Sequence, residues 1–348
     1  MTAVRLAFLD LPVAERDTYF RQTALERAMH APLMEKDFWV SWLLAVLFSH
    51  PELSEHLVFK GGTSLSKVAH AIDRFSEDID LSLSPALVGI DEAEVEAAGS
   101  RTQRDRWMAR LEAECTRTVE GQVRTILESA VREATGSRPG GEPWLESRRD
   151  EVSQSPVLLF HYPSVVSEGF AYLPRSVKLE FGSLTDQRPT GRHPVTPWIA
   201  EVLPAAFGDW RCEVVALEVE RTFWEKATIL HSEAHRDPAD PMPLRYSRHY
   251  ADLAALARGP VAARALARTD LRDRVVGWKT RYFARAWARY DLAVPGTFRL
   301  LPPESRHAQL SADYSSMRDL FITPPPPFAD VMRTLAALEH EINHGVSA

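Results

Sequence analysis

Cysteine and long hydrophobic runs are scarce in this sequence. Only two cysteines, Cys115 and Cys212, occur among 348 residues, too few for a disulfide framework or a four-cysteine zinc site. The longest apolar stretch, residues 38–48, falls far short of the ~20 residues that span a bilayer. Acidic residues also come too early in the chain for a secretory signal. We therefore expect a reduced, cytoplasmic protein that does not enter a membrane.

The glycine patterns of the common nucleotide-binding loops are also missing. No GxxxxGK sequence followed by Ser or Thr occurs, and no GxGxxG opens a helix after a strand. This excludes the usual P-loop and Rossmann sites. The segment HSEAH at 231–235 places two histidines one helical turn apart, but it lacks the HExxH order of zinc proteases. The chemistry has to be sought in other motifs.

What is present is typical of a globular protein with about two domains. Hydrophobic residues make up 45% of the chain and charged residues 26%. We expect a mixed α/β domain over residues 1–215, including N-terminal helices, and a mainly helical domain over 216–348. Charged, helix-prone sequence predicts helices over 91–135, and a Pro/Gly-rich loop follows to residue 150. Short apolar or alternating runs predict strands at 57–60, 77–83, 157–162 and 176–182.

Positive charge is concentrated in one segment of an otherwise acidic chain. The net charge is −7, yet residues 258–289 hold nine Lys or Arg and two Asp, a net charge of +7. Within this segment arginines recur every four residues, which predicts one helix face for each of two trios. The trios are Arg264, Arg268 and Arg272, and Arg281, Arg285 and Arg289. Such a face is either a solvated helix surface or a track for RNA phosphates, which arginine binds bidentately.

The most informative motif is KGGTSLSKVAHAIDRFSEDIDLSL, residues 60–83. A strand runs into Gly61-Gly62, a helix is expected to start near Thr63 or Ser64, and a second strand brings Asp78 and Asp80. Residues two apart on a strand point to the same side, and two adjacent carboxylates repel unless a cation lies between them. Mg²⁺ prefers such oxygen ligands. Glycines allow close backbone approach, and a helix start favours anions, so the segment predicts a cation site beside a phosphate site.

A third carboxylate is expected from a neighbouring strand. In SVKLEFGS, Glu180 lies between two apolar residues, so it belongs to the polar side of the strand, and Lys178 shares that side. The alternative is that Glu180 simply faces water, as an isolated glutamate in a strand usually does. An ordinary glycine turn before an exposed Asp-x-Asp strand is the corresponding alternative for the motif at 60–83.

Together these motifs resemble the nucleotidyltransferase superfamily with the DNA polymerase β-like fold, and more closely the AbiEii/AbiGii toxin family. That family includes toxins of abortive-infection and type IV toxin–antitoxin systems. Three further stretches carry the resemblance, which covers roughly residues 30–260. They are Glu35-Lys36-Asp37, the RTFWEK sequence at 221–226, and the Arg-x-x-x-Asp spacing of Arg248 and Asp252. One departure is His249, where relatives often carry Asp.

The resemblance implies an α+β fold, with a polymerase β-like nucleotidyltransferase core and a mainly helical C-terminal region. It implies that Asp78, Asp80 and Glu180 bind one or two Mg²⁺ ions, and that an NTP is the substrate. The loop residues Gly61, Gly62, Thr63 and Ser64 would then hold the β and γ phosphates.

In the helical half, the resemblance implies that Lys226 neutralises phosphate charge as a point cation. Asp252 would orient Lys226, contact the nucleotide or aid the acceptor. The sequence does not show that Lys226 and Asp252 meet, and an exposed helix pair is the alternative for both.

The resemblance and the basic segment together indicate the acceptor and partners. We expect transfer of a nucleotide to the 3′ end of tRNA, and a cognate antitoxin encoded next to the toxin. Two alternatives stay open: a nucleotidyltransferase that modifies a protein target, and a non-catalytic nucleotide- or RNA-binding module on the same fold. Intact carboxylates at Asp78, Asp80 and Glu180 argue against the second.

Overall fold

The chain folds as two compact units, each described here by itself. In the computed structural model, unit 1 comprises Met1–Val68 and Ser76–Leu217, and unit 2 comprises Ala69–Phe75 and Glu218–Ala348. The structure describes residues 6–91, 97, 99–151, 153–167, 174–184 and 186–345. The expected helical stretch at 91–135 falls partly on 92–96 and 98, which lie outside the described residues. The sequence did not indicate that segment 69–75 belongs with the C-terminal unit.

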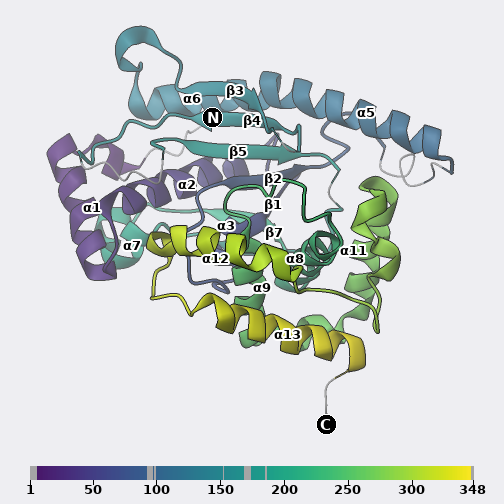
Figure 1. Ribbon diagram of the computed structural model, residues 1–348. Helices are drawn as coiled ribbons and strands as arrows, with labels where there is room; N and C mark the ends of the chain where they lie inside the picture. The colour runs from purple at the N-terminus through teal and green to yellow at the C-terminus, as the bar shows by residue number, and fades with distance from the viewer. Residues whose placement is uncertain are drawn as a thin grey trace. The chain divides into compact units, whose positions relative to one another are not determined.

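Unit 1 is built on a mixed sheet with strand order β3-β4-β5-β2-β1-β7-β6 (Figure 1). Strand β2 pairs in parallel with β5 and antiparallel with β1, and β1 pairs in parallel with β7. The strands are β1 Leu57–Lys60, β2 Ile79–Leu83, β3 Leu145–Arg149, β4 Pro156–Phe160, β5 Val177–Gly182, β6 Thr190–Pro194 and β7 Glu213–Leu217. The two strands that carry the acidic motifs, β2 and β5, are therefore neighbours in the interior of the sheet.

The helices of unit 1 include one that is almost wholly buried. Helix α2, Ala31–Ser49, is apolar on all sides except for three charged residues near its start, and it packs against β5 and β7. The other helices of this unit are α1 Val13–Arg27, α3 Gly61–Lys67, α5 Arg101–Thr118, α6 Arg124–Thr135 and α7 Trp198–Val202. A helix that is hydrophobic all round is stable in water only when it is buried.

Two strands and one helix differ from the sequence-based expectation. Strand β3 lies where we expected a loop, and β6 lies in a stretch without a periodic signal; both are edge strands with mainly polar residues. Helix α3 begins at Gly61 rather than near Thr63, and it ends at Lys67. The chain leaves unit 1 directly after α3, and His70 adopts a positive φ of 47° that no helix tolerates.

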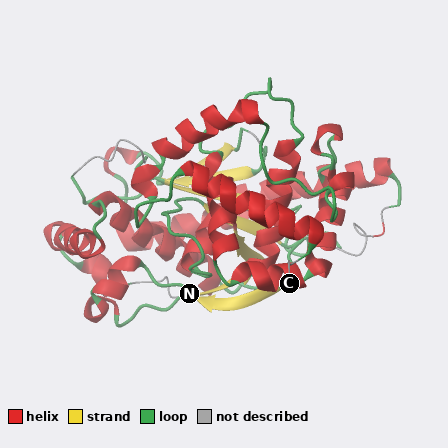
Figure 2. Ribbon diagram, turned by 60° about the horizontal axis from the view of Figure 1, so that its bottom comes forward, coloured by secondary structure: helices red, strands yellow, loops and turns green. Residues whose placement is uncertain are grey.

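Unit 2 is helical apart from an isolated bridge between Arg74 and Phe321. Its helices are α8 Val219–Ala234, α9 Ser247–Arg258, α10 Val261–Ala267, α11 Thr269–Tyr282, α12 His307–Ser316 and α13 Phe328–His344. Figure 2 shows the helical content in red and the strands in yellow. The expected α+β class, with a mainly helical C-terminal region, is confirmed.

The arginine-rich segment does not form the two continuous helix faces that the sequence predicted. Helix α10 ends at Ala267 and α11 begins at Thr269, so the first trio spans a break at Arg268. The second trio is divided because α11 ends at Tyr282, and Arg289 has a left-handed φ of 45°. Arg268 and Arg289 each form a bidentate ion pair with an aspartate two residues further on. Side chains two residues apart do not face each other on a helix. The ion pairs of Arg268 and Arg289 can therefore form because the backbone at these two arginines is not helical.

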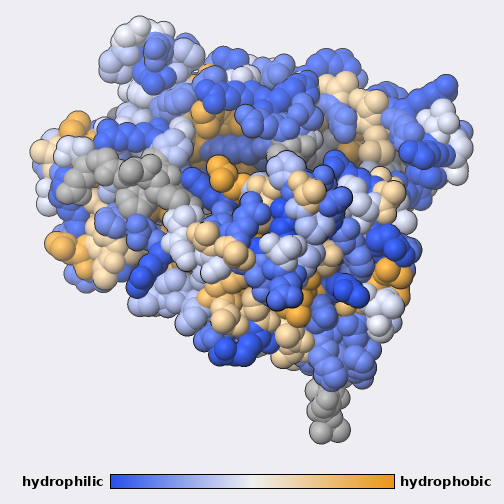
Figure 3. Space-filling model, viewed as in Figure 1, coloured by the Kyte–Doolittle hydropathy of each residue, from blue (hydrophilic) through white to orange (hydrophobic). Residues whose placement is uncertain are grey.

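Hydrophobic surface is limited on the face that Figure 3 shows, where orange patches are small and scattered among hydrophilic side chains. The exposed large hydrophobic residues are correspondingly far apart in sequence: Val13, Leu25, Leu244, Phe283 and Val294. Among the described residues, no helix is both long and apolar enough to cross a membrane.

Candidate functional site

The predicted carboxylates of unit 1 lie on one face of the sheet. Asp80 on β2 and Glu180 on β5 are direct partners in the parallel register of these strands, so their side chains project from the same face. Asp78 lies directly before β2 and contributes electrostatically to Lys178, which precedes Glu180 on that side of β5. We call this surface, defined by Asp78, Asp80 and Glu180, the carboxylate face.

Gly61 brings the loop backbone into direct contact with the carboxylate face. A Cβ atom at Gly61 would lie 1.9 Å from Oδ2 of Asp80, and the residue has φ of +80°. Both the backbone conformation and the approach of Asp80 therefore exclude a side chain at this position. The close approach that the sequence predicted for the glycine pair is found here, and Asp80 is what the loop approaches.

The hydroxyl groups of the loop are used within the protein. Thr63 donates to the backbone carbonyl of Asp78 and lies 2.9 Å from the Ser76 hydroxyl, and Ser64 donates to the carbonyl of Gly61 over 3.0 Å. Thr63 thereby joins α3 to the residue that carries the first carboxylate. The expected contact of Thr63 and Ser64 with phosphates stays a prediction.

Glu180 is held by a lysine on its own strand. The Lys178 ammonium lies 2.8 Å from Oε2 of Glu180 and 2.6 Å from Oδ2 of Asp150, and Ser153 donates to Oε1 of Glu180 over 2.9 Å. Burial by itself would lower the pKa of Lys178, but the hydrogen bonds to the two carboxylates raise it above its usual value. The third carboxylate is thus the partner of a fixed positive charge.

The donor set suits a hard divalent cation, because Asp80 and Glu180 offer carboxylate oxygens from adjacent strand positions. Within the described ranges, however, no three or more His, Cys, Asp or Glu side chains are grouped so as to hold one metal ion. Metal binding by Asp78, Asp80 and Glu180 therefore stays a prediction.

The buried charges at the start of α2 support the segments around this face. Glu35, Lys36 and Asp37 are each about 1% exposed. Lys36 pairs with Glu77, the residue before Asp78, and donates to the carbonyl of Pro174 over 3.2 Å. Glu35 accepts hydrogen bonds from the segment at 164–165. The sequence identified Glu35-Lys36-Asp37 as a motif, but it did not indicate which residues these three side chains contact.

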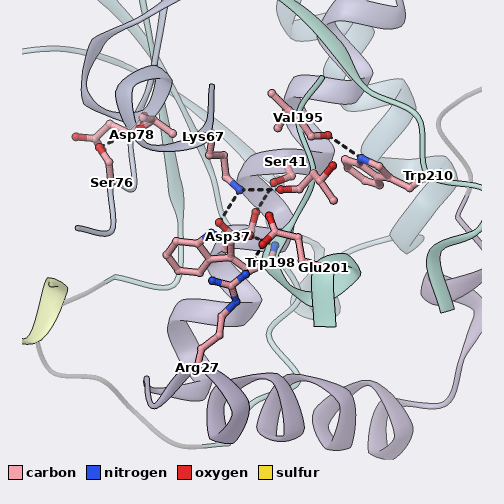
Figure 4. Close-up of polar contacts among 12 residues, drawn as sticks. Arg27, Asp37, Ser41, Lys67, Ser76, Asp78, Val195, Trp198, Glu201 and Trp210 are labelled. Carbon is pink, nitrogen blue, oxygen red and sulfur yellow. Dashed lines mark hydrogen bonds and ion pairs between the residues drawn. The ribbon is translucent and has the colours of Figure 1, made fainter. Parts of the chain in front are cut away.

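Asp37 anchors the C-terminal end of α3 (Figure 4). One of its carboxylate oxygens lies 2.6 Å from the ammonium of Lys67, the last residue of α3, and the other accepts from the backbone N–H of Trp198 over 2.7 Å. The Lys67 ammonium also lies over the Trp198 ring, 5.7 Å from its centre. The short helix that begins with Gly61 is therefore fixed at its far end by a buried ion pair.

In unit 2, Lys226 and Asp252 meet. The Lys226 ammonium lies 2.8 Å from Oδ2 of Asp252, and both side chains are buried. Arg74 binds the same carboxylate bidentately over 2.7 and 2.8 Å. Burial alone would raise the pKa of Asp252, but the two cations hold it below its usual range. Burial lowers the pKa of Lys226 and outweighs the opposing effect of Asp252. The expected alternative of an exposed helix pair does not apply.

His249 has a clear place in this cluster. Its Nδ1 lies 3.2 Å from the Lys226 ammonium, and burial together with the neighbouring cations keeps its pKa well below the usual value. A neutral imidazole can accept a hydrogen bond from an ammonium group. This chain therefore has an uncharged hydrogen-bond acceptor at His249.

Two participants escaped the sequence analysis. Lys178 was noted only as sharing a side with Glu180, and its spacing of two residues was the signal that could have identified the pair. Arg74 gave no such signal, because its partner Asp252 lies 178 residues further along the chain.

A Gly61→Ala substitution is expected to reveal the contact with Asp80. The new methyl group has to displace the carboxylate, which costs roughly 1–3 kcal/mol as overpacking, in addition to about 1–2 kcal/mol for the positive φ. The matched control is Gly89→Ala, since Gly89 has a φ of +70° with nothing within 4 Å of its Cβ position. Urea unfolding measures both. Equal losses of stability in the two variants would mean that the Asp80 side chain can move away from the new methyl group without a loss of folding free energy.

An Asp252→Asn substitution tests the buried ion cluster. It leaves the buried Arg74 guanidinium without its counter-charge, so the free energy of unfolding should fall by about 3–5 kcal/mol. Because the pKa of Asp252 is lowered, its stabilisation is fully present above the unfolded pKa of about 3.9 and is lost only as the pH falls towards the folded pKa. Measurements at pH 7 therefore see the full effect.

The control for this cluster is Glu213→Gln, which breaks an ion pair of 3.3 Å to Arg192 on the exposed edge of the sheet. Solvent screens such a pair, so stability should change by less than about 1 kcal/mol. A loss in Asp252→Asn no larger than that in Glu213→Gln would contradict a structural role for the cluster.

Comparison with known proteins adds to this geometry. Among solved structures, MenT4, a nucleotidyltransferase toxin from Mycobacterium tuberculosis H37Rv, is 17% identical, with coverage of 97% of this chain and 100% of its own and a TM-score of 0.44. JHP933 from Helicobacter pylori is 14% identical, with coverage of 76% and 86% and a TM-score of 0.31. These likenesses are too low to carry an argument. No curated protein matches the chain in sequence.

The family comparison is extensive. Residues 42–336 match the sequence pattern described as nucleotidyl transferase AbiEii toxin, type IV toxin–antitoxin system. The match contains the glycine loop, all three carboxylates, Lys226 and Asp252, whereas the triplet at 35–37 lies before it. Because the match spans well over half of the sequence, the chain belongs to the AbiEii family of nucleotidyltransferase toxins.

Proposed function

We propose that this toxin carries out a Mg²⁺-dependent transfer of a nucleotide from an NTP to the 3′ end of tRNA. The observation that carries the proposal is the contact of the Gly61 backbone with Asp80, whose strand partner is Glu180. A glycine loop and paired carboxylates are thereby brought together in one part of unit 1. Membership of a nucleotidyltransferase toxin family makes NTP the substrate of this arrangement.

In this proposal, Asp78, Asp80 and Glu180 are the residues that hold the metal. When bound, Mg²⁺ would supply charge stabilisation for the triphosphate and lower the pKa of the attacking hydroxyl. The chain's own part is to keep the carboxylates in place: Thr63 holds the Asp78 backbone, and Lys178 orients Glu180.

We assign phosphate binding to the loop Gly61, Gly62, Thr63 and Ser64. Since the hydroxyls of Thr63 and Ser64 bond within the protein, backbone N–H groups at the start of α3 are the expected donors. Lys226 and Asp252 are proposed as further residues on which transfer depends. The burial of Lys226 and its bond to Asp252 support a precisely fixed amine rather than a mobile surface charge.

The excess of basic residues over 258–289 supports an RNA acceptor, although it is weaker than the sequence indicated. Ion pairs occupy Arg264, Arg268, Arg272 and Arg289. Arg274 and Arg285 also have exposed side chains, and we use these two positions to test the proposal. Bound RNA phosphates release counterions, so the interaction should weaken steeply with salt.

The biological setting follows from the family. A type IV toxin implies a cognate antitoxin, and we propose that the two act in the cytoplasm, where NTP and tRNA are available. A role in abortive infection is part of the same proposal.

Asp80→Asn is expected to abolish nucleotide transfer, because the amide loses the charge that attracts the metal. The assay incubates the purified full chain with Mg²⁺, each labelled NTP in turn and total tRNA. Glu213→Gln, on another strand of the sheet, should retain full activity. Transfer by Asp80→Asn at the wild-type rate would remove the carboxylate face from the mechanism. Label found only on protein would favour a protein-modifying enzyme instead, and no label at all would favour a non-catalytic module.

Replacing Arg274 and Arg285 together by Ala should reduce tRNA labelling severalfold at moderate salt while NTP binding stays unchanged. The matched control is Arg101→Ala with Arg117→Ala, which removes the same charge from exposed positions on α5. Equal labelling by the two double variants would place RNA on a different surface.

A further inference from the structure

Lys279 is a positively charged side chain of unit 2 for which the structure shows no carboxylate partner. It lies on α11, which packs against α8 (Figure 1), and it is half-buried. Its ammonium group donates one hydrogen bond, over 3.2 Å, to the backbone carbonyl of Glu225. Within the described parts of the chain it forms no ion pair and no other hydrogen bond. A lysine ammonium withdrawn from water is usually paired with a carboxylate, so this arrangement is unusual.

The Glu225 carbonyl is a poor substitute for a counter-ion. It also accepts a hydrogen bond from the Thr228 hydroxyl over 2.9 Å, and as a carbonyl inside α8 it is the acceptor for the next helical turn. A carbonyl oxygen has two lone pairs, so three donors compete for it. The Glu225 carboxylate pairs with Arg221 over 3.4 Å. Lys279 therefore has a weak, shared acceptor for a group that has three donors.

Lys279 nevertheless remains mostly protonated at neutral pH. Burial lowers its pKa to about 8, the Glu225 charge opposes this effect, and the charges of Arg221 and Lys226 add to it. At pH 7 the group is thus an ammonium ion that has other cations nearby. Amines perturbed in this way are common at functional sites.

Arg248, near the start of α9, is a second cation of this kind. Its side chain is half-buried and has neither an ion pair nor a hydrogen bond among the described residues. Its charge lowers the pKa of Lys226 and of His249. Lys226, by contrast, is committed to Asp252 at 2.8 Å. Near Lys226, the charges of Lys279 and Arg248 are therefore available to an anion from outside the protein.

We propose that Lys279 and Arg248 form a phosphate-binding site in unit 2, and that the triphosphate of the NTP is its ligand. This inference deepens the proposed function and rests on it, because the NTP is the substrate assumed there. Half-buried cations suit a small, highly charged anion, whereas an RNA backbone needs an exposed track. Lysine contributes a point charge and arginine a fork of donors, and phosphate oxygens accept hydrogen bonds from both.

The experiment titrates inorganic triphosphate into the purified full chain by calorimetry, at pH 7 in metal-free buffer and without RNA. Lys279→Met should weaken binding roughly tenfold, because one charge-assisted hydrogen bond is lost. Arg248→Met should weaken it severalfold, and Lys279→Arg should keep most of the affinity. The matched control is Arg333→Met, which removes an exposed cation of unit 2 that pairs with Asp330 on α13. This control should bind like wild type.

The pH dependence separates a binding role from a structural one. Lys279 loses its proton as the pH rises through about 8, whereas an arginine stays protonated. The affinity of wild type relative to Lys279→Arg should therefore fall about tenfold between pH 7 and pH 9. The triphosphate, Lys226 and the other titratable groups are present in both proteins, so their changes cancel in this ratio. A constant ratio would mean that Lys279 does not bind the anion.

A measurement on the unmodified chain keeps the test decisive even if a variant misfolds. Trace acetic anhydride acylates neutral, accessible amines, and mass spectrometry reads each lysine separately. Triphosphate should lower the labelling of Lys279 severalfold compared with chloride at equal ionic strength. Equal labelling in the two salts would contradict the site.

The outcomes separate this inference from the proposed function. Unchanged triphosphate affinity in Lys279→Met overturns the site, and a loss of tRNA labelling in the same variant would then assign Lys279 to RNA instead. Wild type that binds no triphosphate overturns the site as well. If binding depends on Lys279 but wild type transfers no nucleotide to tRNA, then the phosphate site stands and the proposed acceptor is wrong.

Discussion

Repulsion between carboxylates that share a sheet face constrains the two neighbouring strands β2 and β5 of unit 1. Parallel pairing of β2 with β5 places Asp80 next to Glu180, and like charges directly opposite each other destabilise a sheet. The protein balances this cost locally, with Lys178 and Ser153 on Glu180. The charge of Glu180 is thereby compensated within its own strand and by a neighbouring loop.

The same principle operates in unit 2, where charge is buried more deeply. Arg74, Lys226 and Asp252 compensate one another out of contact with bulk water. Removing one member of such a cluster leaves an uncompensated charge, which is costly whatever the residue does chemically. Loss of activity in an Asp252 variant therefore does not by itself identify a catalytic group. Arg74 stands four residues before Asp78 in the chain.

How well an element could be predicted from the sequence depended on where it lies in the fold. Interior strands such as β1 and β5 were predictable because burial requires an apolar or alternating pattern. The edge strands β3 and β6 were missed, since an edge exposed to water can be built from residues such as LESRR and TGRHP. The helix break at Arg268 was missed because arginine continues a helix as readily as it flanks one.

For the site, sequence motifs identified residues but not their partners. The register that pairs Asp80 with Glu180 and the contact that brings Arg74 to Asp252 both arise from tertiary structure. Residue types and their spacing indicate which chemistry a segment can perform. They do not identify the counter-ions. In unit 1 the counter-ion of Glu180 is Lys178 on the same strand, and in unit 2 the counter-ion of Asp252 includes Arg74 from a distant stretch of the chain.

The intolerance of Gly61 for a side chain has a practical consequence. Substitutions of the carboxylates change the charge of the region and with it every electrostatic contact to a nucleotide or a protein partner. A single methyl group at Gly61 disturbs the geometry while the full set of charges is kept. A loss of transfer in such a variant would therefore point to geometry rather than to charge.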